Sequence, residues 1–207
     1  MSLLANTIKA IQPVTADTAY DIKQHLSSVM EGDNNTLGEL ERLLLRTIAI
    51  TGERHPQLKK CTIICCGDHG VAVEGVSAYP PETTLQMVKN YLISRGAAAN
   101  ALANYCDSAL TVVDMGINAD TSDIPNLINA RIASGTQNIA KGPAMTHKQA
   151  IKAIETGINL AEKAFAKGFN CLLPGEMGIA NTTSSAAICA VCCNLAPENV
   201  TGYGTNI

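Results

Sequence analysis

The chain is poor in aromatic residues: of its 207 residues, two are Phe, five are Tyr and none is Trp. This shortage argues against a surface on which nucleic-acid bases stack. The 15 basic and 18 acidic residues give a net charge of -3 and include no cluster of five like charges, so the sequence offers no electrostatic footprint for nucleic acid. A small ligand, neutral or anionic, is the expected partner.

Long apolar runs are missing at the start of the sequence. Residues 1–15 contain short apolar patches and one early lysine, Lys9, but no stretch that suits the hydrophobic segment of a signal peptide or a membrane span. We therefore expect a soluble, cytoplasmic protein with no membrane partner. A chain of this length can bury a sizeable core.

The eight cysteines lie in apolar surroundings such as 61–66 and 189–193, so reduced, buried thiols are expected rather than a disulfide framework. Cys189 and Cys192 have C-x-x-C spacing, which leaves a redox pair or half of a metal site open as alternatives. Small buried side chains are the favoured interpretation, because no second C-x-x-C and no H-x-x-x-H completes a metal site. No metal site is predicted.

Helical and strand patterns alternate along the chain. Continuous apolar runs predict buried strands at 61–66, 109–114 and 169–173. Helical spacing of apolar residues predicts helices at 37–52, 82–94, 97–105, 146–168 and 182–195. Thr36 and Thr146 each begin a capping-box pattern. Strands that alternate with helices of ten or more residues predict an α/β fold with a parallel sheet, whose chemistry lies at the carboxyl ends of the strands.

The turn after the third expected strand, Gly175-Glu-Met-Gly-Ile-Ala-Asn-Thr-Thr183, leads into a helix. Free backbone N–H groups and the helix dipole at such a turn favour an anion such as phosphate. Gly178 permits close approach, Asn181 and Thr182 can donate hydrogen bonds to phosphate oxygens, and Glu176 suits ribose hydroxyls or a developing cationic sugar. An alternative stays open in which Asn181 and Thr182 cap the helix and Glu176 is a solvated loop acid.

The loop after the first expected strand offers a second set of polar groups. Ser77, Tyr79 and Gln86 place a few polar side chains in an otherwise apolar cleft, an arrangement that orients aromatic ligands. Asp68 and His69 are candidates for an acid/base pair. However, adjacent residues at a strand end usually point apart, so a hydrogen-bonded loop histidine is the favoured interpretation.

Two further glycine-rich segments cannot be interpreted alone. Residues 134–146 either line the same cleft or turn the chain. The small residues of Gly202-Tyr-Gly-Thr205 suit a second nest of backbone N–H groups facing phosphate.

Nine ordered motifs between Gly67 and Thr205 resemble the nicotinate-nucleotide:dimethylbenzimidazole phosphoribosyltransferase family of cobamide (vitamin B12) biosynthesis. The motifs are Gly67-Asp-His-Gly70, Gly75-Val-Ser77, Gln86-Met-Val88, Val113-Asp-Met-Gly116, Gly135-Thr136, Gly142-Pro-Ala-Met-Thr146, Gly175-Glu-Met-Gly-Ile179, Asn181-Thr-Thr183 and Gly202-Tyr-Gly-Thr205. The resemblance implies a Rossmann-like parallel sheet with flanking helices, a smaller helical portion, and a homodimer or a heterodimer with a homologous subunit.

By this resemblance the protein is a pentosyltransferase that needs no cofactor. It is expected to transfer phosphoribosyl from nicotinate mononucleotide to an aromatic lower-ligand base, either dimethylbenzimidazole or a phenol, giving an α-ribotide and nicotinate. Glu176 is the implied catalytic group, close to the ribose. The implied nucleotide-binding residues are Met177, Gly178, Asn181, Thr182, Gly202, Gly204 and Thr205. The candidates for the base pocket are Ser77, Tyr79 and Gln86.

The sequence departs from the family pattern at three places. Ala180 replaces a glycine, which adds a methyl group and restricts a backbone torsion beside the phosphate. Asn206 replaces a second glycine and tolerates a left-handed conformation better than most residues. The third departure is an expectation from the resemblance: the family's general-base glutamate belongs to a C-terminal portion that we expect to lie beyond these 207 residues.

We therefore expect an incomplete Rossmann-like domain at 61–207, preceded by an N-terminal helical segment at 1–60 that belongs to a small domain. The missing part would be a separate chain, or a partner would supply the base. An alternative of another class is a non-catalytic nucleotide-binding subunit that supports a homologous catalytic partner. A purely structural alternative, in which the glycine-rich loops are only tight turns, predicts no mononucleotide binding.

Overall fold

The computed structural model describes residues 2–14, 20–24 and 37–205 of the chain. The chain divides into two compact units, Met1–Leu58 and Lys59–Ile207. No helix in the described part of the chain combines the length and the apolar character that crossing a membrane requires.

The first unit contains α1 (Leu3–Ala10) and α3 (Glu39–Thr51). Gly38 precedes α3 and makes no side-chain cap, while Gly52 ends the helix in the left-handed conformation that favours glycine. The predicted cap Thr36 lies outside the described residues. The helix predicted at 37–52 is therefore present, and it begins at Glu39.

The second unit is built on a four-stranded sheet, and all the strand pairs are parallel. The strands lie in the order β3-β2-β1-β4, and their bounds are Lys60–Gly67 for β1, Ser108–Gly116 for β2, Ile128–Asn129 for β3 and Cys171–Met177 for β4. Ile64 of β1 pairs with Val112 on one side and Gly175 on the other. The α/β fold with a parallel sheet is confirmed.

The strand predicted at 169–173 is displaced toward its carboxyl end, because β4 continues through Pro174 to Met177. Proline lacks a backbone donor, and β4 lies at the edge of the sheet, where one side of the strand needs no ladder hydrogen bonds. As a result, Glu176 and Met177 belong to the strand and not to the loop that the sequence suggested. Both residues are held in register with β1.

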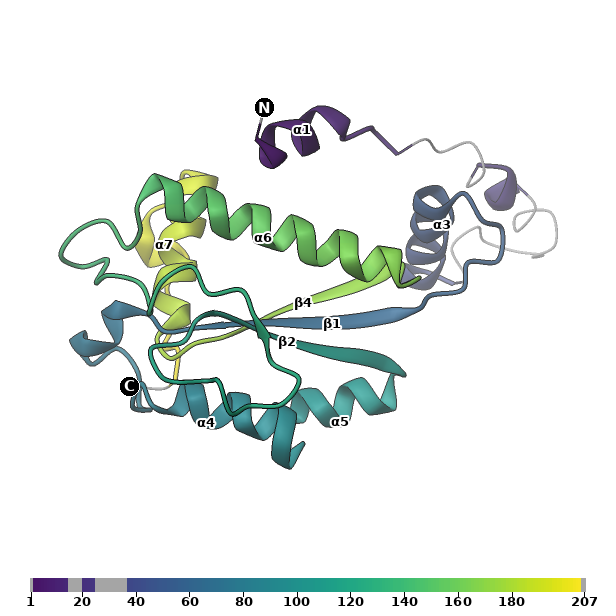
Figure 1. Ribbon diagram of the computed structural model, residues 1–207. Coiled ribbons are helices and arrows are strands. Elements are labelled where there is room, and N and C mark those ends of the chain that lie inside the picture. Colours follow the sequence, from purple (N-terminus) through teal and green to yellow (C-terminus); the bar gives the residue numbers. More distant parts are fainter. Residues whose placement is uncertain (1, 15–19, 25–36, 206–207) are drawn as a thin grey trace. The chain divides into compact units, whose positions relative to one another are not determined.

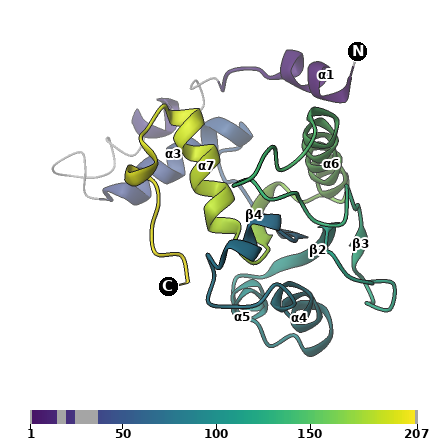
Figure 2. The ribbon, with the colours of Figure 1, turned by 90° about the vertical axis from the view of Figure 1, so that its left-hand side faces the viewer.

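Helices cover both faces of the sheet (Figures 1 and 2). α4 (Thr83–Lys89), which widens into a π-helical turn, and α5 (Ala98–Tyr105) lie on one face, and α6 (His147–Ala166) lies on the other. α7 (Asn181–Cys193) lies beyond the carboxyl ends of the strands. The predicted capping box at Thr146 is confirmed, since its side chain accepts from Gln149 N while the Gln149 side chain accepts from Thr146 N.

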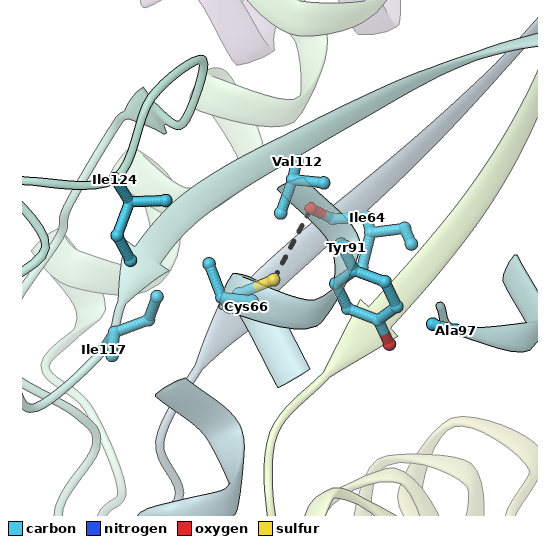
Figure 3. Close-up of a cluster of buried hydrophobic side chains, with 8 residues drawn as sticks. Ile64, Cys66, Tyr91, Ala97, Val112, Ile117 and Ile124 are labelled. Atoms are coloured by element: carbon cyan, nitrogen blue, oxygen red, sulfur yellow. Dashed lines mark hydrogen bonds between the residues drawn. The ribbon is translucent and has the colours of Figure 1, made fainter. Parts of the chain in front are cut away.

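The core lies between the sheet and α4 (Figure 3). Val112 and Cys66 from the strands meet Val88 and Tyr91 from the helix side, and each of the first three is fully buried. Burying apolar area stabilises the fold by about 25 cal/mol per Å². This packing fixes β1 and β2, whose carboxyl ends carry the candidate site.

The prediction of buried thiols is wrong for half of the cysteines. Cys61 and Cys66 are buried in β1, but four others are exposed: Cys106, Cys189, Cys192 and Cys193. The last three lie on α7, of which no described residue is buried. The polar and apolar residues of α7 are not separated onto two faces, so its sequence carries no amphipathic pattern that shows which face is covered.

Candidate functional site

The carboxyl ends of β1 and β4 bring a histidine and a glutamate together. His69 lies two residues beyond the end of β1, and Glu176 is the penultimate residue of β4. His69 Nε2 is 3.1 Å from Glu176 Oε1, while His69 Nδ1 is 3.0 Å from Ser184 Oγ on α7. If Nε2–H donates to the carboxylate, Nδ1 accepts from the serine hydroxyl, and every group in this chain of contacts is satisfied.

Asn181 completes the surroundings of Glu176 by donating from Nδ2 to Oε2. Both carboxylate oxygens therefore have a partner, yet the Glu176 side chain remains 43% exposed and the His69 side chain 17% exposed. The carboxylate is thus oriented from two sides while still accessible to a ligand. Preorganised charge of this kind stabilises positive charge that develops on a bound substrate.

Asp68 and His69, named as candidates for an acid/base pair but expected to point apart, are not paired. Asp68 Oδ2 accepts from Asn118 N at 2.7 Å, whereas His69 contacts Glu176. The favoured interpretation of His69 as a hydrogen-bonded loop histidine agrees with this geometry, but its partner is the residue predicted to be catalytic. No pattern in the sequence pointed to Ser184.

Gly178 is required by packing at the ends of the two strands. A Cβ at this position would overlap the carbonyl oxygen of Gly67 and lie 2.8 Å from Cδ2 of His69. Any side chain would therefore separate β4 from β1 and displace His69. The sequence assigned this glycine to close approach of a phosphate, and the structure adds a reason that holds without a ligand.

Ala180 is in the left-handed conformation, with φ of 72°, as the N-cap of α7. This is the position where the family pattern has glycine, and the methyl group strains the backbone there. Neither Asn181 nor Thr182 caps α7, because the cap is Ala180 and makes no side-chain hydrogen bond. The alternative interpretation of these two residues as helix caps is wrong. Asn206, the other glycine replacement, lies outside the described residues.

A second polar cluster forms around Thr205. Its Oγ1 accepts from Ala78 N at 2.8 Å and lies 3.4 Å from Ser77 Oγ. A Cβ on the neighbouring Gly204 would lie 3.0 Å from Thr182 Oγ1. The structure therefore brings the segment ending at Thr205 next to the start of α7 and the Ser77 loop, although these parts are far apart in sequence.

Two large cavities flank the start of α7. The strand-end cavity, of about 890 Å³, is lined by Glu176 and His69, by the end of β2, and by residues 132–137, 143–147 and 149. The α7 cavity, of about 990 Å³, is lined by Thr182, Gly202, Gly204 and more of α7. Three of the predicted nucleotide-binding residues, Thr182, Gly202 and Gly204, therefore line the α7 cavity, while the predicted catalytic residue Glu176 lines the strand-end cavity and accepts a hydrogen bond from Asn181.

The predicted base-pocket residues line neither cavity in the described part of the chain. Ser77 lies beside Thr205. Tyr79 is 57% exposed and Gln86 is exposed on α4. Among the described residues, the hydrogen bonds of the Glu176 carboxylate go to His69 and Asn181, not to Tyr79 or Gln86.

Two thiols line the strand-end cavity, and both resist ionisation. Burial raises the pKa of Cys65, and the nearby charge of Glu176 raises it further. Burial is also the main cause that raises the pKa of Cys66 to about 12. Neither thiol is a nucleophile at neutral pH. Among the described residues, no group of three His, Cys, Asp or Glu side chains is arranged to hold a metal ion.

Comparisons with known proteins agree with the motif resemblance. A family model described as phosphoribosyltransferase matches residues 11–207. The chain is 43% identical over 205 residues to a nicotinate-nucleotide–dimethylbenzimidazole phosphoribosyltransferase from Chlorobium chlorochromatii, and 44% identical over 213 residues to one from Geobacter metallireducens. The chain belongs to this phosphoribosyltransferase family.

Coverage of these family members is unequal. The alignments include 99% and 100% of this chain but only 57% and 58% of the two relatives. The crystal structure of CobT from Thermus thermophilus superposes with a TM-score of 0.85 and 39% identity, over 91% of this chain and 57% of that one. The chain thus spans a little over half the length of the phosphoribosyltransferases that it matches.

Proposed function

We propose that the whole protein transfers phosphoribosyl from nicotinate mononucleotide to an aromatic lower-ligand base, dimethylbenzimidazole or a phenol, giving an α-ribotide and nicotinate for cobamide assembly. The observation that carries this proposal is the Glu176 carboxylate, which His69 and Asn181 orient at the carboxyl ends of the strands. Ligands of open α/β sheets bind at this edge.

Displacement at the anomeric carbon makes three demands on the protein. The bond from that carbon to the pyridinium nitrogen breaks, and its electron pair stays on the departing nicotinate. The acceptor base forms the new bond and loses one proton to a general base, from the ring N–H of dimethylbenzimidazole or from the O–H of a phenol. Glu176 supports the positive charge that develops on the sugar while both reactants are held in line.

The phosphate-binding role falls to the cluster around Thr205 and the start of α7. Gly178, Asn181 and Thr182 contribute from one segment, and residues 202–205 contribute from the other. Support comes from their proximity, since a Cβ on Gly204 would lie 3.0 Å from Thr182 Oγ1 and Thr205 Oγ1 already accepts a backbone N–H. In this proposal Met177 shapes the wall beside Glu176, and the acceptor base contacts Ser77, Tyr79 and Gln86.

We extend the proposal to organisation and location. Residues 1–60 form part of a smaller domain, and the protein works as a homodimer or with a homologous subunit. Exposed apolar side chains on α5 support an interface, with Leu102 63% exposed and Tyr105 90% exposed. Eight free cysteines support a cytoplasmic location, where thiols stay reduced.

The test begins with calorimetric titration of the purified chain with nicotinate mononucleotide. A chromatographic assay for α-ribotide, with dimethylbenzimidazole and with phenol, follows on the same sample. Binding and product with either base support the transfer. Binding without product supports the non-catalytic subunit, and the absence of binding contradicts the phosphate site.

A further inference from the structure

Both oxygens of the Glu176 carboxylate are held from the first turn of α7. Oε2 accepts directly from Asn181 Nδ2, and Oε1 is 3.1 Å from His69 Nε2. The other ring nitrogen, His69 Nδ1, is 3.0 Å from Ser184 Oγ. Asn181 is the first residue of α7 and Ser184 is the fourth, so one helical turn reaches the carboxylate by two routes. One route is direct, and the other passes through the imidazole ring.

The partners of the ring fix which of its nitrogens carries the proton. An ionised carboxylate only accepts hydrogen bonds, so His69 Nε2 donates to Glu176. In a neutral ring Nδ1 then has no proton and accepts from the Ser184 hydroxyl. A ring turned over by about 180° would direct carbon atoms at both partners and lose both contacts. The hydroxyl therefore favours the ring orientation that presents a donor to the carboxylate.

The backbone beneath the ring brings the same two side chains together. A Cβ at Gly178 would lie 2.8 Å from both His69 Cδ2 and Glu176 Oε1, so a glycine is needed for them to meet there. The ring is thus packed on the backbone at one edge and bonded to polar groups at two others. Without the Ser184 hydroxyl, Nδ1 would lose its protein partner, and the ring would be held less firmly.

The order carboxylate, imidazole, hydroxyl is also that of a catalytic triad, in which the hydroxyl attacks the substrate. Access to the three groups argues against that chemistry. Glu176 and His69 line the strand-end cavity, but Ser184 is not among the described residues that line this cavity or the α7 cavity. A ligand in the strand-end cavity therefore meets the carboxylate and not the hydroxyl. Ser184 is placed to orient the ring and not to attack a substrate.

We propose that Ser184 is a positioning residue of the transfer: its hydroxyl holds His69, which in turn holds the Glu176 carboxylate against the ribose. This inference rests on the proposed function. Asn181 and Thr182, in the same turn of α7, are the residues assigned to the phosphate of the nucleotide. One helical turn therefore sets the position of the carboxylate relative to the phosphate before the substrate binds, which is how a preorganised site lowers a barrier.

The first test is a double-mutant cycle in steady-state transfer. Ser184→Ala should lower kcat by about three- to tenfold, the effect of one lost hydrogen bond, with little change in KM for nicotinate mononucleotide. In a His69→Ala background it should have no further effect, because the hydroxyl then has no ring to hold. Ser184→Thr keeps the hydroxyl and should recover part of the loss. Ser94→Ala, at an exposed serine that ends the π-helical turn, is the matched control.

A second measurement observes the ring itself and needs no turnover. Nitrogen NMR of isotope-labelled histidine should show His69 with a proton on Nε2 and none on Nδ1. Ser184→Ala should shift the Nδ1 signal, because that nitrogen loses the hydrogen bond that it accepts. The His69 signals are identified by their loss in His69→Gln. His55, which is exposed in the first unit, is the internal control and should not move.

The outcomes separate this inference from the proposed function. Additive losses of kcat in the cycle, or a His69 spectrum that Ser184→Ala leaves unchanged, overturn the role of Ser184 and leave the transfer proposal intact. An unsubstituted chain that forms no α-ribotide overturns the proposed function and the positioning role with it. Non-additive losses of kcat together with a shifted Nδ1 signal support both.

Discussion

His69 Nε2 and Glu176 Oε1 lie 3.1 Å apart, although 107 positions separate the two residues in sequence. They meet because β1 and β4 are neighbours in the sheet, so residues at their carboxyl ends share one edge. Ser184 on α7 fixes the far side of the imidazole ring at 3.0 Å. The His69 ring is therefore held by α7 on one side and orients the Glu176 carboxylate of β4 on the other.

Glu176→Gln should lower turnover far more than nucleotide binding. The amide keeps the size of the side chain but removes the negative charge that stabilises a cationic sugar. We expect kcat to fall by about 100-fold, the scale found for a lost electrostatic group in an active site. Calorimetric affinity for nicotinate mononucleotide should change much less. Glu162→Gln, exposed on α6, is the control, and equal losses in binding and turnover would contradict the assignment.

His69→Ala should lower kcat with little change in KM, because the substitution frees Glu176 from one of its two partners. His69→Gln should recover part of the loss, since its amide can donate to the carboxylate. The measurement is steady-state transfer with varied nicotinate mononucleotide for both variants. If His69→Gln is no better than His69→Ala, the histidine has a role other than positioning Glu176.

The sequence predicted three of the four strands in the described sheet, because continuous apolar runs rich in β-branched residues mark buried parallel strands, and it missed the two-residue β3, which has no such run. It did not predict that β4 reaches Met177, since Pro174 is a strand breaker except at a sheet edge, and edge position depends on strand order. The contact between His69 and Glu176 was missed for the same reason, because predicting it requires knowing that β1 and β4 are neighbours in the sheet. Features of the local backbone could be predicted from the sequence. The family motif has glycine where this chain has Ala180, and the φ of 72° at Ala180 shows why a glycine suits that position.

Ala180→Gly should stabilise the protein. Glycine removes the strain of a left-handed alanine, about 1 to 2 kcal/mol, and loses part of this gain through its more flexible unfolded state. We expect a net increase of about 0.5 to 1 kcal/mol in the free energy of unfolding, measured with urea. Ala186→Gly, inside the same helix, should instead lower it by about 1 kcal/mol. A loss of stability in Ala180→Gly would contradict the strain.

Cys66 should make stability fall at alkaline pH. Burial raises its pKa to about 12 in the folded protein, while the usual value for a thiol is 9.0, so the folded state holds the proton more tightly than the unfolded state does. This contribution is fully present below pH 9 and is lost between pH 9 and about 12, by about 1.4 kcal/mol per pH unit. Urea unfolding at pH 8 and pH 10 should show a smaller pH dependence in Cys66→Ala than in the unsubstituted chain. Equal dependence would mean that the thiol ionises alike in both states.

Gly178→Ala should disrupt the site by separating its two strands. The added methyl group would overlap the carbonyl oxygen of Gly67 and lie 2.8 Å from Glu176 Oε1, and backbone atoms of paired strands have little room to move. We expect a loss of several kcal/mol in unfolding free energy, about 2 to 4, together with loss of nucleotide binding.

Gly157→Ala tests whether that loss is specific to the strand ends. Gly157 lies within α6, and a Cβ there would meet no atom within 4 Å. Alanine should therefore stabilise the helix by about 1 kcal/mol. The same chemical change thus has opposite signs at two glycines. Normal stability and nucleotide affinity in Gly178→Ala would show that β1 and β4 can separate without harm, and that the contact between His69 and Glu176 does not depend on their close approach.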